Sequence, residues 1–88
     1  MTTEQLINNI ASANDCTPAE IMGKSKVAHI ANARALLQYA LRENGWHFAR
    51  IGRAFNTDHS NAIHNHRKVA KALALAESYK KALTKDCA

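Results

Sequence analysis

The sequence predicts an all-α fold, and three observations support this. The apolar residues make up 47% of the 88-residue chain and are mostly Ala, Leu, Ile and Val rather than aromatic residues. Alanine is the best helix former and occurs along the whole sequence. Three Gly and one Pro are too few for the many tight turns of an all-β fold. We therefore expect one domain over residues 1–88, a compact bundle of about five or six helices.

The first helix is expected close to the amino terminus. Thr2 and Gln5 have the spacing of a capping box, in which each side chain binds a backbone group of the other residue at the helix start. The helix should therefore begin near Thr2 or Thr3. An apolar face follows, and the pattern ends at residues 14–15.

A short second helix is expected next. Thr17 offers a capping hydroxyl, Pro18 suits the first helical position, and Glu20 lies three residues after the cap. Gly23 is placed to stop this helix. Residues 23–26, Gly-Lys-Ser-Lys, then form a basic loop.

The longest helix is predicted from about Val27 to Asn44, with Gly45 as its stop. Apolar residues recur along one of its faces at spacings of three and four, with Arg34 at the same spacing. The apolar face comprises Val27, Ile30, Leu37 and Leu41, widened by Ala33, Leu36 and Ala40. A helix of this length and character is expected to be the central one.

A helix-turn-helix is expected over about residues 47–71. Its first helix is short and amphipathic, because Phe48, Ile51 and Phe55 recur at helical spacing. Gly52 lies inside it and costs about 1 kcal/mol relative to Ala. A close helix–helix approach would explain a glycine there.

A polar turn at residues 56–58 leads into the final helix, which should begin near Asp58 or His59. The spacing of apolar residues does not decide whether this helix breaks near Ala74 or continues beyond it. The expected inward positions are Ala62, Val69, Leu73 and Ala76.

Positive charge is concentrated around this motif. The formal net charge is +5; residues 24–76 carry nine Lys or Arg against two acids, whereas residues 1–23 carry three acids and neither Lys nor Arg. Such a distribution is typical of a phosphate-binding face, although a solvated helical surface also carries charge. The candidate phosphate contacts are Arg34, Arg42, Arg50, Arg53, Arg67 and Lys68.

The start of the final helix carries the candidate base contacts. His59 and Ser60 can each donate or accept a hydrogen bond, and Asn61 can pair bidentately with adenine in the major groove. Asp58 suits the capping position of the helix, and an Asp there often only accepts backbone amides. The basic surroundings favour DNA binding over an ordinary polar helix start.

Metal binding is a weaker interpretation of the same region. His59, His64 and His66 are separated by five and two residues, whereas ligands on one helix face need spacings of three or four. We expect no metal site and no cofactor.

Catalysis is not expected, because the sequence has no Gly-rich phosphate loop and no catalytic constellation. Cys16 could lie near a helix start, which would lower its pKa, but no orienting partner is identifiable and an inert cysteine is expected. A pairing with Cys87 stays open. Without an apolar run of about 18–20 residues or a signal peptide, we expect a cytoplasmic protein with no membrane contact.

Several segments match a known family in order. They are Ala33-Arg34 followed by Tyr39 and Arg42-Glu43, IGRAF at 51–55, DHS at 58–60, Ile63-His64, and Arg67-Lys68. On these segments, residues from about Ile7 to Leu73 resemble the C-terminal DNA-binding domain (domain IV) of DnaA, the bacterial replication initiator. The resemblance implies a helix-turn-helix of the Trp-repressor-like type.

The resemblance also implies how DNA would be contacted. The helix that starts at Asp-His-Ser would enter the major groove, and the basic loop would reach the adjacent minor groove through Lys24 and Lys26. Arg34 and Arg42 would contact the DNA backbone. The implied base-contacting set is Asp58, His59, Ser60 and Asn61.

The sequence departs from the family at the turn, which is one residue shorter and lacks the Arg that usually precedes Asp-His. Asn61 replaces a common Thr, and two lysines stand in an otherwise arginine-rich loop. We expect a sequence-specific double-stranded DNA-binding module that regulates replication initiation or transcription. The alternative is a protein-interaction module whose basic face docks an acidic partner in either process. Monomer or dimer stays open, with the helix after Ala74 as a possible dimer contact.

Overall fold

The computed structural model describes the backbone of residues 2–86 and the side chains of residues 2–78. Within this range the chain forms five helices and no strand, which confirms the predicted all-α class. Cys87, and with it the possible pairing with Cys16, lies outside the described residues. The helices are α1 (Thr3–Ala13), α2 (Pro18–Met22), α3 (Ala28–Glu43), α4 (Phe48–Ala54) and α5 (His59–Asp86).

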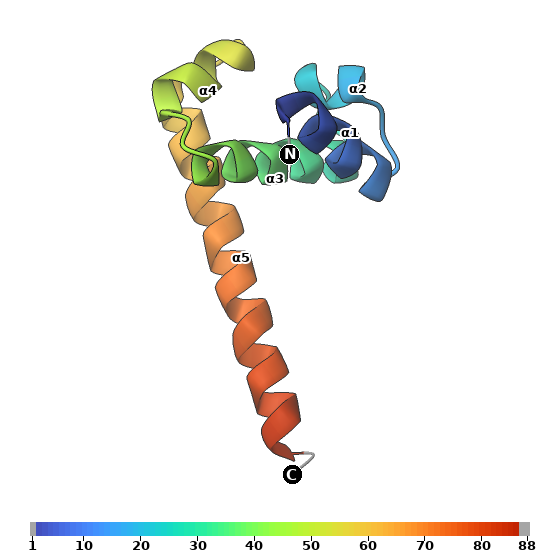
Figure 1. The fold of residues 1–88 in the computed structure, drawn as a ribbon, viewed down its shortest axis with the longest axis vertical. Coiled ribbons are helices and arrows are strands. Elements are labelled where there is room, and N and C mark those ends of the chain that lie inside the picture. The colour runs from blue at the N-terminus through green and yellow to red at the C-terminus, as the bar shows by residue number, and fades with distance from the viewer. Residues whose placement is uncertain (1, 87–88) are drawn as a thin grey trace.

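Helix α3 lies across the middle of the molecule and contacts each of the other four helices, as the sequence predicts for a central helix. Helices α1 and α2 contact each other on one side of it, whereas α4 and α5 contact each other on the other side (Figure 1). All five helices contribute to one buried cluster. Its members are Ile10, Ala11, Ile21, Ala33, Leu37, Leu41, Ile51, Phe55 and Ala62.

Local capping sets the helix ends near the amino terminus as predicted. The amide of Gln5 donates to Thr2 Oγ1 at 3.2 Å, and the amide of Thr2 donates to Gln5 Oε1 at 3.0 Å. The amides of Thr17 and Glu20 make the same reciprocal pair of bonds with each other's side chains at the start of α2. Gly45 follows α3 with φ 97°, a conformation that glycine adopts without steric cost.

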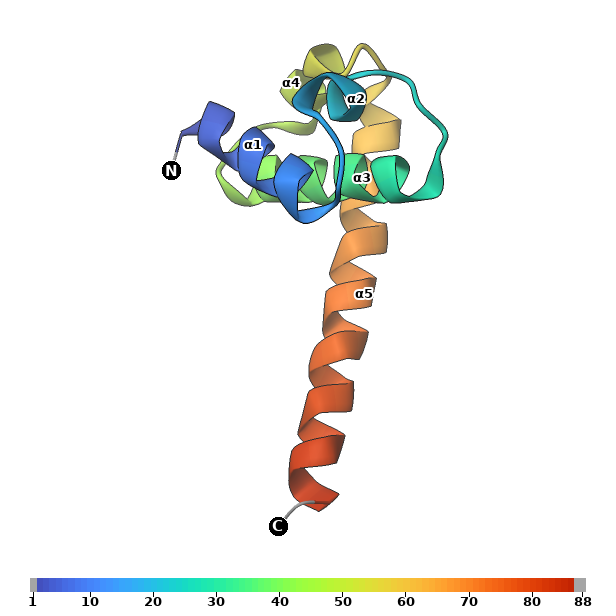
Figure 2. The same ribbon diagram turned by 90° about the vertical axis from the view of Figure 1, so that its right-hand side faces the viewer.

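The carboxyl-terminal half of α5 leaves the body of the molecule (Figures 1 and 2). The helix is continuous to Asp86, so it has no break near Ala74. Leu73 and Ala76, which were expected to face inward, are exposed because no other helix reaches this part of α5. Val27 was also expected inside, but it precedes α3 as its cap residue and is 53% exposed.

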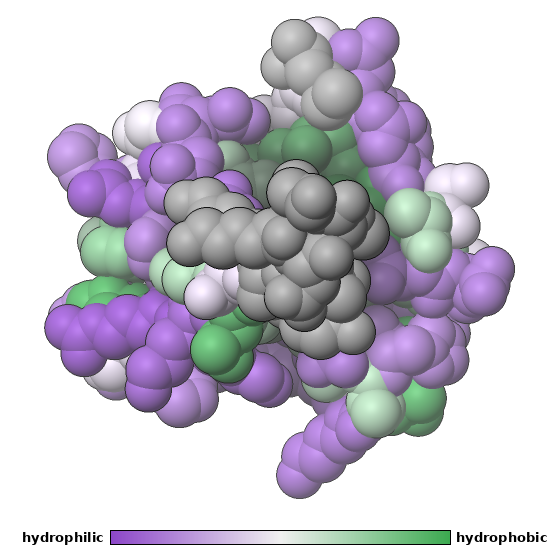
Figure 3. Space-filling model, turned by 90° about the horizontal axis from the view of Figure 1, so that it is seen from below, coloured by the Kyte–Doolittle hydropathy of each residue, from purple (hydrophilic) through white to green (hydrophobic). Residues whose placement is uncertain are grey.

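The surface seen from below, around the projecting end of α5, is largely hydrophilic with scattered apolar residues (Figure 3). No helix among the described residues has both the length and the apolar character that crossing a bilayer requires.

Aromatic and polar contacts fix α5 against α3 and α4. The ring of His66 stacks on Tyr39 with centroids 4.8 Å apart and meets the edge of Phe48 at 5.6 Å. His66 Nε2 lies 3.1 Å from Glu43 Oε1. Because these partners come from both α3 and α4, His66 holds the crossing of the three helices and has a structural role.

Gly52 lies where α4 approaches the turn that leads into α5. A Cβ atom at this position would lie 2.9 Å from the carbonyl oxygen of Thr57 and 3.1 Å from the amide nitrogen of His59. Asn56 supports the turn with φ 53°, a left-handed conformation that Asn tolerates better than most residues. The close approach expected at Gly52 is therefore made to the backbone of the turn and of the first residue of α5.

We predict that Gly52→Ala introduces steric strain of about 2–3 kcal/mol, because the neighbouring atoms are backbone and cannot rotate away. This outweighs the roughly 1 kcal/mol that Ala gains in helix propensity. Thermal unfolding followed by circular dichroism should show a midpoint lower by about 4 °C or more. The control is Ala49→Gly at an exposed position of the same helix. It measures the difference in helix propensity between Ala and Gly without the steric contact. A higher midpoint for Gly52→Ala would contradict the steric argument.

Candidate nucleic-acid interface

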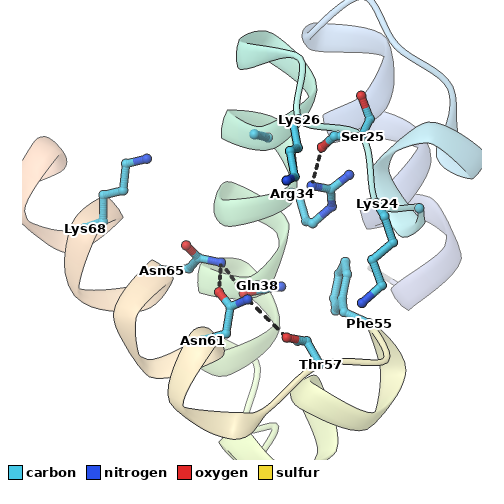
Figure 4. A pocket seen from close by; sticks show the side chains of 12 residues that line it. Lys24, Ser25, Lys26, Arg34, Gln38, Phe55, Thr57, Asn61, Asn65 and Lys68 are labelled. Carbon is cyan, nitrogen blue, oxygen red and sulfur yellow. Dashed lines mark hydrogen bonds between the residues drawn. The ribbon is translucent and has the colours of Figure 1, made fainter.

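A groove of about 360 Å³ separates the basic loop at residues 23–26 from the first turns of α5 (Figure 4). The loop forms one wall, α5 and the turn before it form the other, and α3 lies between them. The cationic lining consists of Lys24, Lys26, Arg34 and Lys68. Three cations from residues 24–34 and one from α5, 34 or more residues further along the sequence, thus bring positive charge to one concave surface.

Arg34 holds the basic loop in place. Its Nε donates to the carbonyl oxygen of Ile21 at 2.7 Å, and its Nη1 donates to that of Ser25 at 2.9 Å. Its Nη2 donates to the carbonyl oxygen of Glu20 at 3.1 Å. These bonds tie two carbonyls of α2 and one of the loop to α3. The guanidinium therefore builds the groove wall as well as lining it.

Lys24 reaches across from the loop to the helix-turn-helix. Its Nζ donates to the carbonyl oxygen of Asn56 at 2.7 Å, in the turn before α5. Lys26 is exposed and has no hydrogen bond or ion pair to another described residue. Lys24 thus sets the distance between the loop and the turn, whereas the side chain of Lys26 is available to bind a ligand at the surface.

Asp58 caps the start of α5. Its Oδ1 accepts from the amide of Ser60 at 3.4 Å and lies 3.1 Å from His59 Nδ1. The amide of Asn61 donates to the Asp58 carbonyl oxygen at 3.1 Å. The capping role considered from the sequence is therefore present. His59, Ser60 and Asn61 are all exposed in the first turn of the helix.

A chain of side-chain hydrogen bonds runs from this first turn to α3 (Figure 4). Asn61 Nδ2 donates to Thr57 Oγ1 at 3.1 Å, and Asn65 Nδ2 donates to Asn61 Oδ1 at 3.1 Å and to Gln38 Oε1 at 2.8 Å. The sequence analysis did not select Thr57, Asn65 or Gln38. Helical spacing could have indicated two of the three, since Asn65 lies four residues after Asn61 and Gln38 four after Arg34.

The outer surface of α5 carries a second polar strip. Its members recur at helical spacing and are all exposed: Ser60, His64, Arg67 and Lys71. Lys68 lies beside this strip and also lines the groove. His64 and Lys71 were not among the predicted contacts, although they share a face with two residues that were.

The other predicted arginines surround α4. Arg42 is half-buried; its Nη1 donates to the carbonyl oxygen of Trp46 at 3.1 Å, and its guanidinium lies 4.8 Å from the ring centre of Phe48. The guanidinium of Arg50 lies 3.7 Å from the ring centre of Trp46, a cation–π contact that positions it. Arg53 is exposed. Arg42 therefore has a structural role whether or not it also binds DNA.

Cys16 does not have the lowered pKa that a position near a helix start suggested. Partial burial raises the pKa of its thiol, and the carboxylates of Glu20 and Asp15 raise it further. The thiol also lies 3.7 Å from the carbonyl oxygen of Ala11. Within the described part of the chain, no three His, Cys, Asp or Glu side chains are grouped so that they could hold a metal ion.

Two helices joined by a tight turn, with the second helix beside a basic groove, define a helix-turn-helix domain of the nucleic-acid-binding class. The chain matches the family described as bacterial DnaA protein helix-turn-helix over residues 3–69, and it belongs to this family. It is therefore a DNA-binding domain, and the matched module is not a catalytic one. A search of curated proteins found no match. The family match ends at residue 69, close to where α5 leaves the body.

We predict that Arg34→Ala destabilises the domain by about 2–3 kcal/mol, because charged hydrogen bonds to three carbonyls are lost at once. Urea denaturation should show a lower midpoint, and amide exchange should accelerate in residues 24–27. Lys26→Ala removes a cation from the loop but none of these bonds, so its stability should stay within about 0.5 kcal/mol of the wild type. Equal effects of the two substitutions would refute the role assigned to Arg34.

Proposed function

We propose that this chain is a sequence-specific double-stranded DNA-binding module that regulates replication initiation or transcription in the cytoplasm. The start of α5 would lie in the major groove, and the loop at residues 23–26 would lie in the adjacent minor groove. The observation that carries this proposal is the placement of these two elements on opposite walls of one cationic groove.

The geometry suits a duplex because neighbouring major and minor grooves are separated by a phosphodiester strand. A protein that enters both grooves must accommodate that strand between its two contacts. The cationic groove lies between the loop and α5, and Lys26 and Lys68 are exposed at its edges. Seating a negatively charged strand there would release counterions and make binding sensitive to salt.

The remaining cations extend the proposed phosphate-contacting surface on both sides of the groove. Arg67 and Lys71 belong to the exposed strip of α5, whereas Arg50 and Arg53 are exposed on α4. Arg34 and Arg42 would contribute mainly by holding the loop and α4, since both already donate to backbone carbonyls. Sequence would be read by the exposed side chains of the first turn of α5, namely His59, Ser60 and Asn61.

The test begins with selection of bound duplexes from a random library, followed by titration of the selected duplex at several salt concentrations. Affinity should fall steeply as salt rises, because each phosphate contact contributes about 0.9 to the slope of log affinity against log salt. Absence of binding at ~50 mM salt, or binding that salt does not weaken, would overturn the proposal. Capture of an acidic protein that DNA does not displace would support the protein-docking alternative.

Lys68→Ala should weaken binding to all duplexes alike and reduce the salt slope by about 1, since Lys68 is exposed at the edge of the groove. Asn8→Asp, at an exposed position of α1, lowers the net charge by the same amount outside the groove. This control should change the slope far less. If both substitutions act equally, binding depends on overall charge and not on the groove.

Asn61→Ala should have a different signature. We expect it to relax sequence preference at one base pair by about 1–3 kcal/mol, because a bidentate amide contact to adenine is lost. The salt slope should not change, since no phosphate contact is removed. A repeat of the library selection with the variant provides the measurement. A uniform loss of affinity for all sequences would instead assign Asn61 to backbone binding.

A further inference from the structure

The chain of hydrogen bonds beside the groove has a buried anchor. Gln38 is only 1% exposed and is the buried polar side chain of the described core. Its Oε1 accepts from Asn65 Nδ2 at 2.8 Å, the shortest bond of the chain. No buried side-chain nitrogen or oxygen in the described residues lacks a hydrogen-bond partner. Because an unpaired buried amide is costly, Gln38 holds Asn65 in place.

Asn65 in turn fixes the amide of Asn61. Its Nδ2 donates to Asn61 Oδ1 at 3.1 Å, while Asn61 Nδ2 donates to Thr57 Oγ1 at 3.1 Å. If the Asn61 amide rotated by half a turn, its NH2 group would face the NH2 group of Asn65, and two donors would meet. With the Gln38 and Asn65 amides in their present orientations, one orientation of the Asn61 amide is therefore favoured before any DNA is bound.

This orientation leaves hydrogen-bonding capacity on Asn61. An amide oxygen has two lone pairs and an amide nitrogen two N–H groups, and the chain uses one of each. The unused acceptor and donor are the kind of pair that binds the N6 amino group and N7 of adenine in the major groove. Asn61 is an exposed residue in the first turn of α5, as a contact to a base requires.

We propose that Asn65, anchored by Gln38, is a specificity-determining positioning residue that orients the Asn61 amide to read one adenine. This rests on the proposed function, since it requires α5 to enter the major groove. Asn65 itself touches no base in this proposal. It reduces the entropy that Asn61 loses on binding and excludes the flipped amide, which would present its donor and acceptor in the wrong order.

The experiment is a double-mutant cycle on the duplex selected by the wild-type chain. The variants are Asn65→Ala, Asn61→Ala and the pair. The quantity measured is the ratio of affinities for the selected duplex and for the same duplex with the Asn61-dependent base pair replaced. Asn65→Ala should reduce this ratio by about tenfold, with an unchanged salt slope. In the Asn61→Ala background, the same substitution should have no further effect on the ratio.

Asn65→Ala leaves the buried Gln38 without its partner, so it could also loosen the fold. The variant Gln38→Met combined with Asn65→Ala removes both polar partners together and avoids an orphaned amide. We expect it to lose specificity as Asn65→Ala does while keeping a thermal midpoint close to that of the wild type. A loss of specificity only in variants that are also destabilised would overturn the positioning role.

The two levels of the hypothesis fail in different ways. A wild-type chain that selects no sequence overturns the proposed function and this inference with it. A selected sequence whose preference survives Asn65→Ala unchanged, or falls equally with and without Asn61, overturns only the inference. A preference that Asn61→Ala does not relax at any base pair also overturns it.

Discussion

The shape of the candidate interface depends on the bonds that Arg34 makes to three carbonyl groups. Arg34 projects from the central helix and binds Ile21 and Ser25, on either side of the turn into the basic loop. A loop with two lysines at this point would otherwise be repelled by the guanidinium beside it. The planar guanidinium donates in several directions at once, so its hydrogen bonds to the carbonyl groups offset that repulsion and hold the loop against α3. The loop can then face α5 at a set distance.

The second constraint is steric and acts at the helix-turn-helix. The missing side chain of Gly52 lets the turn approach α4, and His66 then ties α5 to α3 and α4. These contacts fix the direction in which the first turn of α5 points. The two constraints act on opposite walls of one groove, so the spacing of the walls follows from α3, which carries Arg34 and contacts α5.

The sequence predicted those features that depend on neighbours along the chain. Both capping boxes, the glycine stop after α3 and the start of α5 are local, since a few adjacent residues determine each of them. It could not predict that Asn65 bonds Gln38, because the two lie 27 residues apart and helical periodicity describes one helix at a time. For the same reason it placed Leu73 inside: the pattern shows which face is apolar, but not where the neighbouring helix ends.

In the proposed function, the groove separates two kinds of contribution to DNA binding. Cations at its edges, such as Lys26 and Lys68, lie in exposed positions where long-range attraction needs little geometric precision. The amides of Asn61 and Asn65 are instead linked by hydrogen bonds to Gln38, which is 1% exposed. Charge can supply affinity for any duplex, whereas a fixed donor and acceptor are needed to distinguish one base pair from another. If the proposed function holds, a chain whose turn departs from its family can keep the charge-based part of binding while the chain of amides beside the groove sets its target sequence.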